Sequence, residues 1–232
     1  MRICGSEILK SLDPQILKFT NMNLPSLMAV VDADVAARAG WTMTDLAAAY
    51  LTGGATLLQL RAKTAPSGWW LDIASTIVTL AHQAKALVIV NDRGDIARLS
   101  GADGVHVGQE DLPPASVRRV VGAEAIVGLS THTPEQMDLA VREPVTYVAI
   151  GPVFSTDTKA TGYGALGLEP VRRAASQARE RALPLVAIGG VTLETAPEVI
   201  HAGATTVAVI SDLLAGGDPA DRVRAYLARL TV

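Results

Sequence analysis

Two cationic side chains and one amide alternate along a short segment, and their spacing suits the binding of a polyanion. The segment reads Gln59-Leu60-Arg61-Ala62-Lys63 and follows a largely apolar run. Successive side chains of an extended strand point to opposite faces, so Gln59, Arg61 and Lys63 share one side. Two cations and an amide that converge in this way would suit a polyanion. An ordinary solvated strand end is the alternative that this segment leaves open.

A second group of polar residues follows the next two apolar runs and has the ligand types of a magnesium site. Asn91 and Asp92 come directly after Leu87–Val90, and Asp111 closes the polar stretch that begins at His106. Mg²⁺ takes hard oxygen ligands, usually one or two carboxylates completed by substrate phosphate oxygens and water. Asp92 and Asp111 are therefore candidate ligands of one Mg²⁺ ion, and His106 is expected in a supporting role. Because aspartate also favours helix N-caps, helix capping is the alternative for each.

Hydroxyl groups gather in the later loops. Ser130 lies outside a GxSxG motif and has no evident His–Asp pair, so we expect it to bind a substrate rather than attack one. Thr156, Thr158 and Lys159 place two hydroxyls and an ammonium within four residues, where they can hold phosphate oxygens. This loop is thus a candidate phosphate site.

The last two apolar runs end in residues that suit a phosphate held by the main chain. One run ends at Gly189-Gly190 and the other at Ile210-Ser211. Backbone N–H groups bind phosphate in such loops, and Gly190 carries no side chain to block a close approach. Gly190, Ile210 and Ser211 are therefore candidate phosphate-binding residues.

The elements that must position these residues are eight short apolar runs that alternate with helix-like segments. The strand candidates are Ser26–Val31, Ala55–Leu60, Ala86–Val90, Gly104–Val107, Ala125–Leu129, Thr146–Ile150, Pro184–Ile188 and Thr206–Ile210. The helix candidates include Thr44–Leu51, Trp70–Ala84, Ala115–Val121, Glu135–Val141, Glu169–Arg181, Leu193–Ala202 and Pro219–Leu230. Such alternation predicts an α/β protein with a parallel sheet, and eight units close a (β/α)8 TIM barrel. An open doubly wound sheet is the main structural alternative.

One domain is expected to contain the whole barrel. The chain has 232 residues, a length that such barrels routinely occupy as one unit. We assign the catalytic barrel to residues 25–232 and an extra N-terminal helix or arm to residues 1–24. In a barrel of this kind catalytic groups lie where strands end and the following loops begin. The polar residues described above all fall at such ends.

Composition excludes several classes of protein. The net charge is −3 and no run of Lys and Arg exceeds two residues, so a nucleic-acid binder is not expected. Cys4 is the only cysteine, which rules out an intramolecular disulfide and favours a reduced, cytoplasmic protein. No stretch of eighteen consecutive apolar residues occurs, so no membrane span is expected. A homo-oligomer is compatible with the sequence but cannot be read from it.

The segment Gly162-Tyr-Gly-Ala-Leu-Gly167 matches the GxGxxG pattern of dinucleotide-binding proteins. That pattern is informative directly after a strand, at the start of a helix, early in a Rossmann unit. Here it follows a long loop late in the chain. We interpret it as a mobile lid over the mouth of the barrel and not as a nucleotide site.

Seven motifs, in order, resemble the thiamine-phosphate synthase family. They are QLRAK (59–63), VNDRGDIA (90–97), GADGVHVGQEDLP (101–113), GLSTHTPEQ (128–136), AIGPVFSTDTK (149–159), VAIGGV (186–191) and VAVISDL (207–213). The resemblance covers about residues 27–228. It implies a transferase of thiamine biosynthesis that joins two small phosphorylated substrates. A hydroxymethylpyrimidine diphosphate and a hydroxyethylthiazole phosphate would give thiamine phosphate and pyrophosphate.

The resemblance also implies roles for individual residues. The pyrimidine diphosphate would be held by Gln59, Arg61, Lys63, Asn91, Ser130 and Lys159. Among these, Arg61, Lys63, Lys159 and Ser130 would act in catalysis. The thiazole phosphate would be held by Thr156, Thr158, Gly190, Ile210 and Ser211. Asp92 and Asp111 would bind one Mg²⁺ ion, and the pyrimidine would ionise before the thiazole nitrogen captures it.

Two departures from the family pattern are small. Ala62 stands where the family often has Glu, on the side of the strand facing away from the mouth, and Ser155 replaces a frequent proline. Two other functions stay open. One is a thiazole tautomerase-like barrel that acts on the thiazole phosphate alone, and the other is a non-catalytic barrel that binds a phosphate ligand. A tautomerase would not need both carboxylates together with the cations of residues 59–63.

Overall fold

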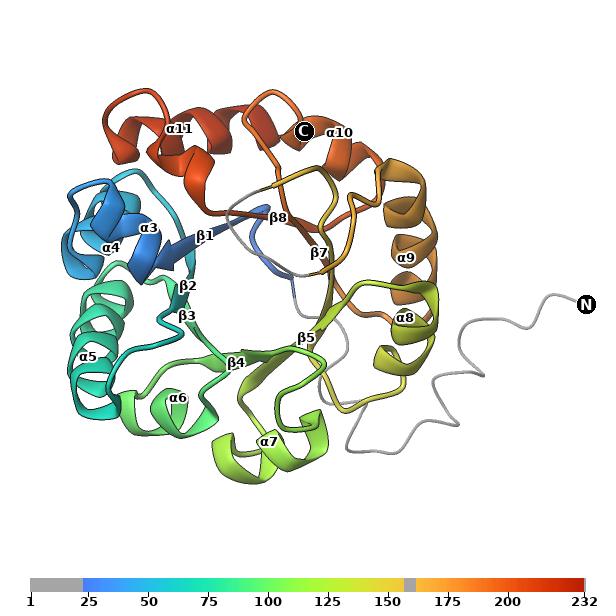
Figure 1. Ribbon diagram of the computed structural model, residues 1–232, viewed down its shortest axis with the longest axis horizontal. Coiled ribbons are helices and arrows are strands. Elements are labelled where there is room, and N and C mark those ends of the chain that lie inside the picture. The colour runs from blue at the N-terminus through green and yellow to red at the C-terminus, as the bar shows by residue number, and fades with distance from the viewer. Residues whose placement is uncertain (1–22, 157–161, 232) are drawn as a thin grey trace, which may run out of the picture.

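The eight apolar runs are the strands of a closed parallel barrel in the computed structural model, which describes residues 23–156 and 162–231 (Figure 1). The strands are β1 (Leu27–Asp32), β2 (Leu57–Arg61), β3 (Leu87–Asn91), β4 (Gly104–Val107), β5 (Ile126–Thr131), β6 (Tyr147–Ile150), β7 (Leu185–Ile188) and β8 (Thr206–Val209). Their order around the barrel is their order in the sequence, and β1 pairs with β8. This closure confirms the predicted (β/α)8 fold and excludes the open doubly wound sheet.

The helices form a ring outside the strands (Figure 1). They are α3 (Ala33–Arg38), α4 (Met43–Thr52), α5 (Ser67–Gln83), α6 (Gly94–Ser100), α7 (Pro114–Val121), α8 (Pro134–Ala140), α9 (Leu168–Glu180), α10 (Ala196–His201) and α11 (Pro219–Leu230), with a 3₁₀ turn η1 (Ser211–Leu214). Only α3 and α6 match none of the helix candidates. With six and seven residues, each is too short to show an amphipathic period.

The strands are buried on both faces, which explains their Val, Leu, Ile and Ala content. One face of each strand packs against the surrounding helices, as Val31 of β1 and Val90 of β3 do. The other face fills the barrel interior, where Met28, Ile89 and Tyr147 belong to one buried cluster. The barrel interior is therefore a packed core and not an open pore.

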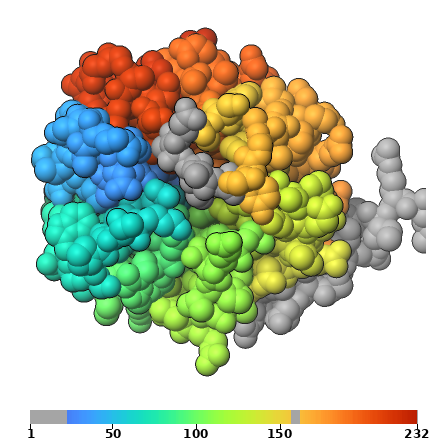
Figure 2. Space-filling view, in the orientation of Figure 1, coloured from blue at the N-terminus to red at the C-terminus, as the bar shows by residue number. Residues whose placement is uncertain are grey.

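Parallel pairing brings the carboxyl ends of all eight strands to one end of the barrel. Asn91 at the end of β3 pairs with His106 of β4, and Ser130 of β5 pairs with Ala149 of β6. Figure 2 shows the face of Figure 1 with all atoms, with successive segments of the chain arranged in order around the centre. The candidate residues of neighbouring strands thus meet at one end of the molecule.

Two further predictions concern an N-terminal arm and membrane-spanning segments. The N-terminal arm was assigned to residues 1–24, of which 1–22 lie outside the described residues, so that assignment stays a prediction. Among the helices of residues 23–156 and 162–231, none is long and apolar enough to cross a membrane.

Candidate active site

A pocket opens at the carboxyl ends of the strands and collects most of the predicted site residues. It contains about 910 Å³ of empty space, the open solvent at its mouth included. The predicted residues that line it are Gln59, Arg61, Asn91, Ser130, Thr156, Gly190, Ile210 and Ser211. Lys63, Asp92 and Asp111, also within the described chain, stand outside this lining, in the loops after β2, β3 and β4.

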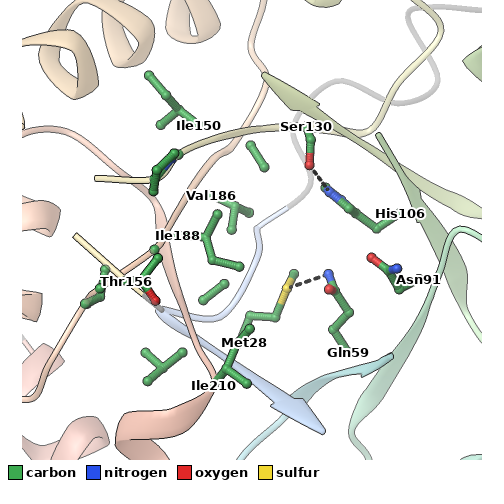
Figure 3. Close-up of a pocket in the computed structure, with 18 of the residues that line it drawn as sticks. Met28, Gln59, Asn91, His106, Ser130, Ile150, Thr156, Val186, Ile188 and Ile210 are labelled. Carbon is green, nitrogen blue, oxygen red and sulfur yellow. Dashed lines mark hydrogen bonds between the residues drawn. The ribbon is translucent and has the colours of Figure 1, made fainter. Parts of the chain in front are cut away.

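The pocket has a polar wall and an apolar wall (Figure 3). The polar wall comes from β2 to β5 and carries Gln59, Asn91, His106 and Ser130. The apolar wall comes from β6 to β8 and the residues after them, and it carries Ile150, Val186, Ile188 and Ile210. A ligand in the pocket would therefore meet hydrogen-bonding groups on one side and hydrocarbon on the other.

Buried hydrogen bonds fix the groups of the polar wall before any ligand arrives. The two ring nitrogens of His106 lie 2.8 Å from the hydroxyls of Tyr147 and Ser130. The Gln59 amide donates to the sulfur of Met28 at 3.4 Å. Burial raises the pKa of the Tyr147 hydroxyl far above its ordinary value, so the hydroxyl stays protonated at neutral pH. The hydrogen bonds thus link Ser130 through His106 to Tyr147.

A glycine on β5 makes room for this network. Gly128 pairs with Tyr147 of β6, and a Cβ at Gly128 would lie 2.1 Å from the tyrosine ring. The ring can therefore cross β5 and reach His106, on which it also stacks at a centroid distance of 5.5 Å. Any larger residue at 128 would displace the tyrosine from the floor of the pocket.

Arg61 is held by an acid that the sequence analysis did not single out. Asp32, at the end of β1, pairs with Arg61 in the strand register, and its Oδ2 forms an ion pair with the guanidinium. Its Oδ1 accepts hydrogen bonds from the backbone N–H groups of Asp34 and Val35 and so caps α3. Asp32 is 2% exposed. The same carboxylate therefore begins a helix and orients a cation of the pocket.

The buried ion pair predicts a measurable effect of Asp32→Asn. Asparagine caps a helix as well as aspartate does, but it leaves the largely buried Arg61 without a counter-charge. We expect a loss of about 3 kcal/mol in the free energy of unfolding, as for one partner removed from a buried pair. Urea denaturation measures it, with Asp34→Asn as the control because Asp34 is exposed on the same helix. A change below about 1 kcal/mol, the usual worth of an exposed pair, would contradict this role.

Asp92 contacts a cation and does not cap a helix. Its carboxylate lies 2.6 Å from the ammonium of Lys63, so the loops after β2 and β3 are joined by an ion pair. Its backbone has a φ of +63°, a left-handed conformation that aspartate tolerates better than most residues. The N-cap of α6 is Arg93, which makes no side-chain capping bond. The capping alternative for Asp92 is therefore wrong.

Asp111 closes its own loop and also does not cap a helix. Its Oδ2 accepts a 2.7 Å hydrogen bond from the backbone N–H of Gly108, while the N-cap of α7 is Pro113. The same loop is fixed to β5 because the Gln109 amide donates to the backbone carbonyl of Ser130 at 2.6 Å. The loop thus presents a carboxylate beside the serine strand.

The donor set suits a magnesium ion that substrate oxygens help to bind. Within the described residues, no group of three or more His, Cys, Asp and Glu side chains could hold a metal by itself. Asp92 and Asp111 offer hard carboxylate oxygens from neighbouring loops, and two carboxylates are the usual protein share of a Mg²⁺ shell. The ion pair with Lys63 engages Oδ2 of Asp92, and Oδ1 is the second oxygen that a cation could use.

Gly190 is required by its own backbone and by a neighbouring loop. Its φ is +65°, and a Cβ at this position would lie 2.5 Å from the carbonyl oxygen of Ser155 and 2.8 Å from Cβ of Phe154. Glycine therefore lets the loop after β6 lie directly against the loop after β7. Glycine at position 190 is therefore required by the contact between the two loops, in addition to the predicted close approach of a phosphate.

Some of the remaining candidate phosphate-binding residues lie within the described part of the chain and others lie outside it. Thr156 lines the pocket with Gly190, Ile210 and Ser211, so the loops after β6, β7 and β8 meet there. Thr158 and Lys159 lie outside the described residues, and their assignments stay predictions.

The GxGxxG segment lies against the loop that follows β6. Leu166 and Gly167 donate backbone hydrogen bonds to the carbonyls of Pro152 and Val153. The ring of Tyr163 stacks on His132 of the pocket with centroids 4.4 Å apart. The segment precedes α9, and the residues directly before it, 157–161, lie outside the described residues. Its predicted mobility is untested.

The chain is similar in sequence and in structure to proteins described as thiamine-phosphate synthases or thiamine phosphate pyrophosphorylases. The profile of the family described as "Thiamine monophosphate synthase" matches residues 27–213. A thiamine-phosphate synthase of Koribacter versatilis is 42% identical over 210 residues, which are 90% of this chain and 97% of that protein. One from a Synechococcus strain is 45% identical over 183 residues, and this chain spans about half of it (51%). The solved structure of thiamine phosphate pyrophosphorylase from Pyrococcus furiosus superposes with a TM-score of 0.78 at 28% identity, covering 89% of this chain and 97% of that one.

Proposed function

Because the chain belongs to the thiamine monophosphate synthase family, we propose that it is a transferase that makes thiamine phosphate. Its substrates are a hydroxymethylpyrimidine diphosphate and a hydroxyethylthiazole phosphate, and its second product is pyrophosphate. One observation carries the proposal beyond the family. A single pocket collects candidate residues for both substrates, and its two walls differ in polarity.

The polar wall suits the pyrimidine diphosphate. The amide NH₂ groups of Gln59 and Asn91 can donate hydrogen bonds to the ring nitrogens of a pyrimidine, which are acceptors. Arg61 lines the same pocket, and its guanidinium has the planar fork of N–H groups that suits a diphosphate. Ser130, held by His106, adds a hydroxyl. Lys63 and Lys159 complete the set of cations that offset the charge of the leaving group.

The opposite side of the pocket suits the thiazole phosphate. Ile188 and Ile210 offer hydrocarbon to the thiazole ring, and Gly190, Ser211 and Thr156 lie where backbone and hydroxyl groups can hold its phosphate. Thr158 is assigned to the same phosphate by its place in the motif. The two substrates would then occupy opposite walls, with their reacting atoms toward the middle of the pocket.

The reaction needs positioning and charge, and it needs no side-chain nucleophile. The bond between the pyrimidine methylene carbon and the diphosphate oxygen breaks, and its electron pair leaves with the diphosphate. The lone pair of the thiazole nitrogen then forms the new bond to that carbon. Cationic side chains favour the departure because they stand where negative charge develops. The buried walls exclude water, which would otherwise capture the carbocation.

Asp92 and Asp111 are the residues that would hold a Mg²⁺ ion. When bound, the ion would neutralise charge on the diphosphate and so make it a better leaving group. Lys63 already pairs with Asp92, and it can thereby keep the loops after β2 and β3 in place.

The test is an incubation of the purified protein with both substrates and MgCl₂, followed by chromatography for thiamine phosphate and pyrophosphate. We expect both products in equal amounts, and neither when one substrate is omitted. A change in the thiazole phosphate alone would indicate a tautomerase-like barrel. Tight binding of either substrate without turnover would indicate a phosphate-binding barrel, and each of these outcomes would reject the synthase.

A further inference from the structure

A partly buried carboxylate next to the predicted phosphate loop is used by none of the steps above. Asp212 follows Ser211 in the 3₁₀ turn η1, immediately after β8. Three groups from other parts of the chain donate hydrogen bonds to its Oδ2. They are the backbone N–H of Leu193, the guanidinium of Arg222 and the hydroxyl of Tyr226.

These donors belong to segments that are far apart in the sequence. Leu193 lies three residues after Gly190, in the loop that follows β7, and donates at 3.1 Å. Arg222 and Tyr226 lie on α11, which follows η1 (Figure 1). The guanidinium of Arg222 makes a 2.7 Å ion pair with Oδ2 and also donates to the backbone carbonyl of Asp212 at 3.1 Å. One carboxylate thus ties both predicted phosphate loops to one helix.

The bonds of Leu193, Arg222 and Tyr226 to the Asp212 carboxylate are called the tether below. Burial makes the tether stronger than an ordinary surface ion pair. The Tyr226 ring is fully buried, and the side chains of Arg222 and Asp212 are 20% and 17% exposed. Arg222 also lies over the Tyr226 ring, 5.8 Å from its centroid. Burial, and then the neighbouring Asp212 carboxylate, raise the pKa of the Tyr226 hydroxyl far above its ordinary value. The hydroxyl therefore remains a donor at neutral pH, and charge-assisted bonds of this kind hold their geometry well.

We propose that Asp212, Arg222 and Tyr226 are positioning residues for the thiazole phosphate alone. The inference rests on the proposed function. The carboxylate fixes the spacing between the loop that carries Gly190 and the loop that carries Ile210 and Ser211, and both loops line the pocket. Of the residues expected to hold the pyrimidine diphosphate, those within the described residues come from β2 to β5 and from Lys63 just after β2, and none of these is among the donors to Asp212. Removal of the tether should therefore weaken binding of the thiazole phosphate and leave binding of the pyrimidine diphosphate unchanged.

The test compares Michaelis constants in Asp212→Ala, Tyr226→Phe and a control. We expect Asp212→Ala to raise the KM for the thiazole phosphate about tenfold, the loss typical of bonds to a charged group. The KM for the pyrimidine diphosphate and kcat at saturation should stay within about twofold. Tyr226→Phe removes one donor without opening a large cavity, so it should show a smaller effect of the same kind.

The control is a second ion pair on the same helix. Asp221 and Arg224 of α11 are paired at 2.5 Å but are 71% and 50% exposed. Asp221→Asn should leave both Michaelis constants unchanged. If Asp212→Ala does not fold, Tyr226→Phe and Arg222→Gln carry the same comparison.

Calorimetric titration of each variant with the thiazole phosphate separates this inference from the proposed function. If the wild type binds that compound but makes no thiamine phosphate, the proposed synthase activity is rejected. The role of the tether is then still tested by comparing the affinities of the variants for the thiazole phosphate. If the wild type does not bind it, both ideas fail. Equal losses for the two substrates, or unchanged affinity in Asp212→Ala and in Tyr226→Phe, would overturn the tether while leaving the synthase in place.

Discussion

Asp111→Asn is expected to lower kcat by at least about 100-fold, the effect of losing one electrostatic contact to developing charge. Asparagine can still accept the hydrogen bond from Gly108, so the loop should keep its conformation. What changes is the charge of a proposed Mg²⁺ ligand. Two carboxylates are a sparse cage for Mg²⁺, so the ion should bind weakly without the diphosphate and strongly with it.

Calorimetric titration with the pyrimidine diphosphate, with Mg²⁺ and with EDTA, measures this coupling directly. In the wild type, metal and diphosphate should each raise the affinity of the other by one common factor. Asp111→Asn should reduce that factor and leave binding of the thiazole phosphate unchanged. The control is Asp95→Asn, because Asp95 lies close to Asp92 in the sequence, is exposed and pairs with Arg93. Equal affinity in Mg²⁺ and EDTA for the wild type would remove both aspartates from a metal site.

Arg61→Ala is expected to reduce kcat/KM by about 1,000-fold, because its guanidinium should stabilise the departing diphosphate directly. Arg61→Lys keeps the charge but loses the planar fork and the ion-pair geometry with Asp32, so it should recover only part of the rate. Steady-state kinetics with both substrates provides the measurement.

The control for Arg61→Ala must distinguish the loss of a group in the active site from the loss of one positive charge elsewhere on the protein. Arg224→Ala serves because Arg224 is half exposed on α11, where it pairs with Asp221. We expect wild-type kinetics for this variant. Thermal melts of all variants identify any that lose activity through unfolding. A folded Arg61→Ala protein with near wild-type kcat/KM would place Arg61 outside the reaction.

Strand positions were predictable because each strand is a short apolar run bounded by turns. Both ends of β4, the last residues of β6 and β7 and the first residue of β8 agree with the predicted ranges, and the other ends differ by one or two residues. Most of the pocket was predictable for a related reason: in a barrel, any polar residue at the end of an apolar run faces the same mouth. Eight of the predicted site residues line one pocket.

The residues that sequence reasoning missed are those whose role depends on pairing between strands. Asp32 resembles a simple helix cap in the sequence, and it becomes a partner of Arg61 only because the two residues share a register position. Tyr147 reaches His106 only because Gly128 lies beside it on β5. Such contacts are set by the alignment of strands that are distant in the chain, and local spacing carries no information about it.

Helix capping by Asp92 and Asp111 could not be decided from the sequence either. Aspartate before a helix suits a cap as well as a ligand, and the choice depends on which donors the loop presents. In the structure the donors are Lys63 and the backbone N–H of Gly108, and the helices begin at other residues.

The unequal walls of the pocket have a consequence for protein engineering. The polar wall is a connected hydrogen-bond network, in which a change at His106 or Tyr147 disturbs several partners at once. The apolar wall is made of independent aliphatic side chains such as Val186 and Ile188. Such positions accept changes of size far more readily than networks accept a lost donor. We therefore expect Val186 and Ile188 to be positions where directed evolution can change side-chain size while the hydrogen bonds of His106 stay intact.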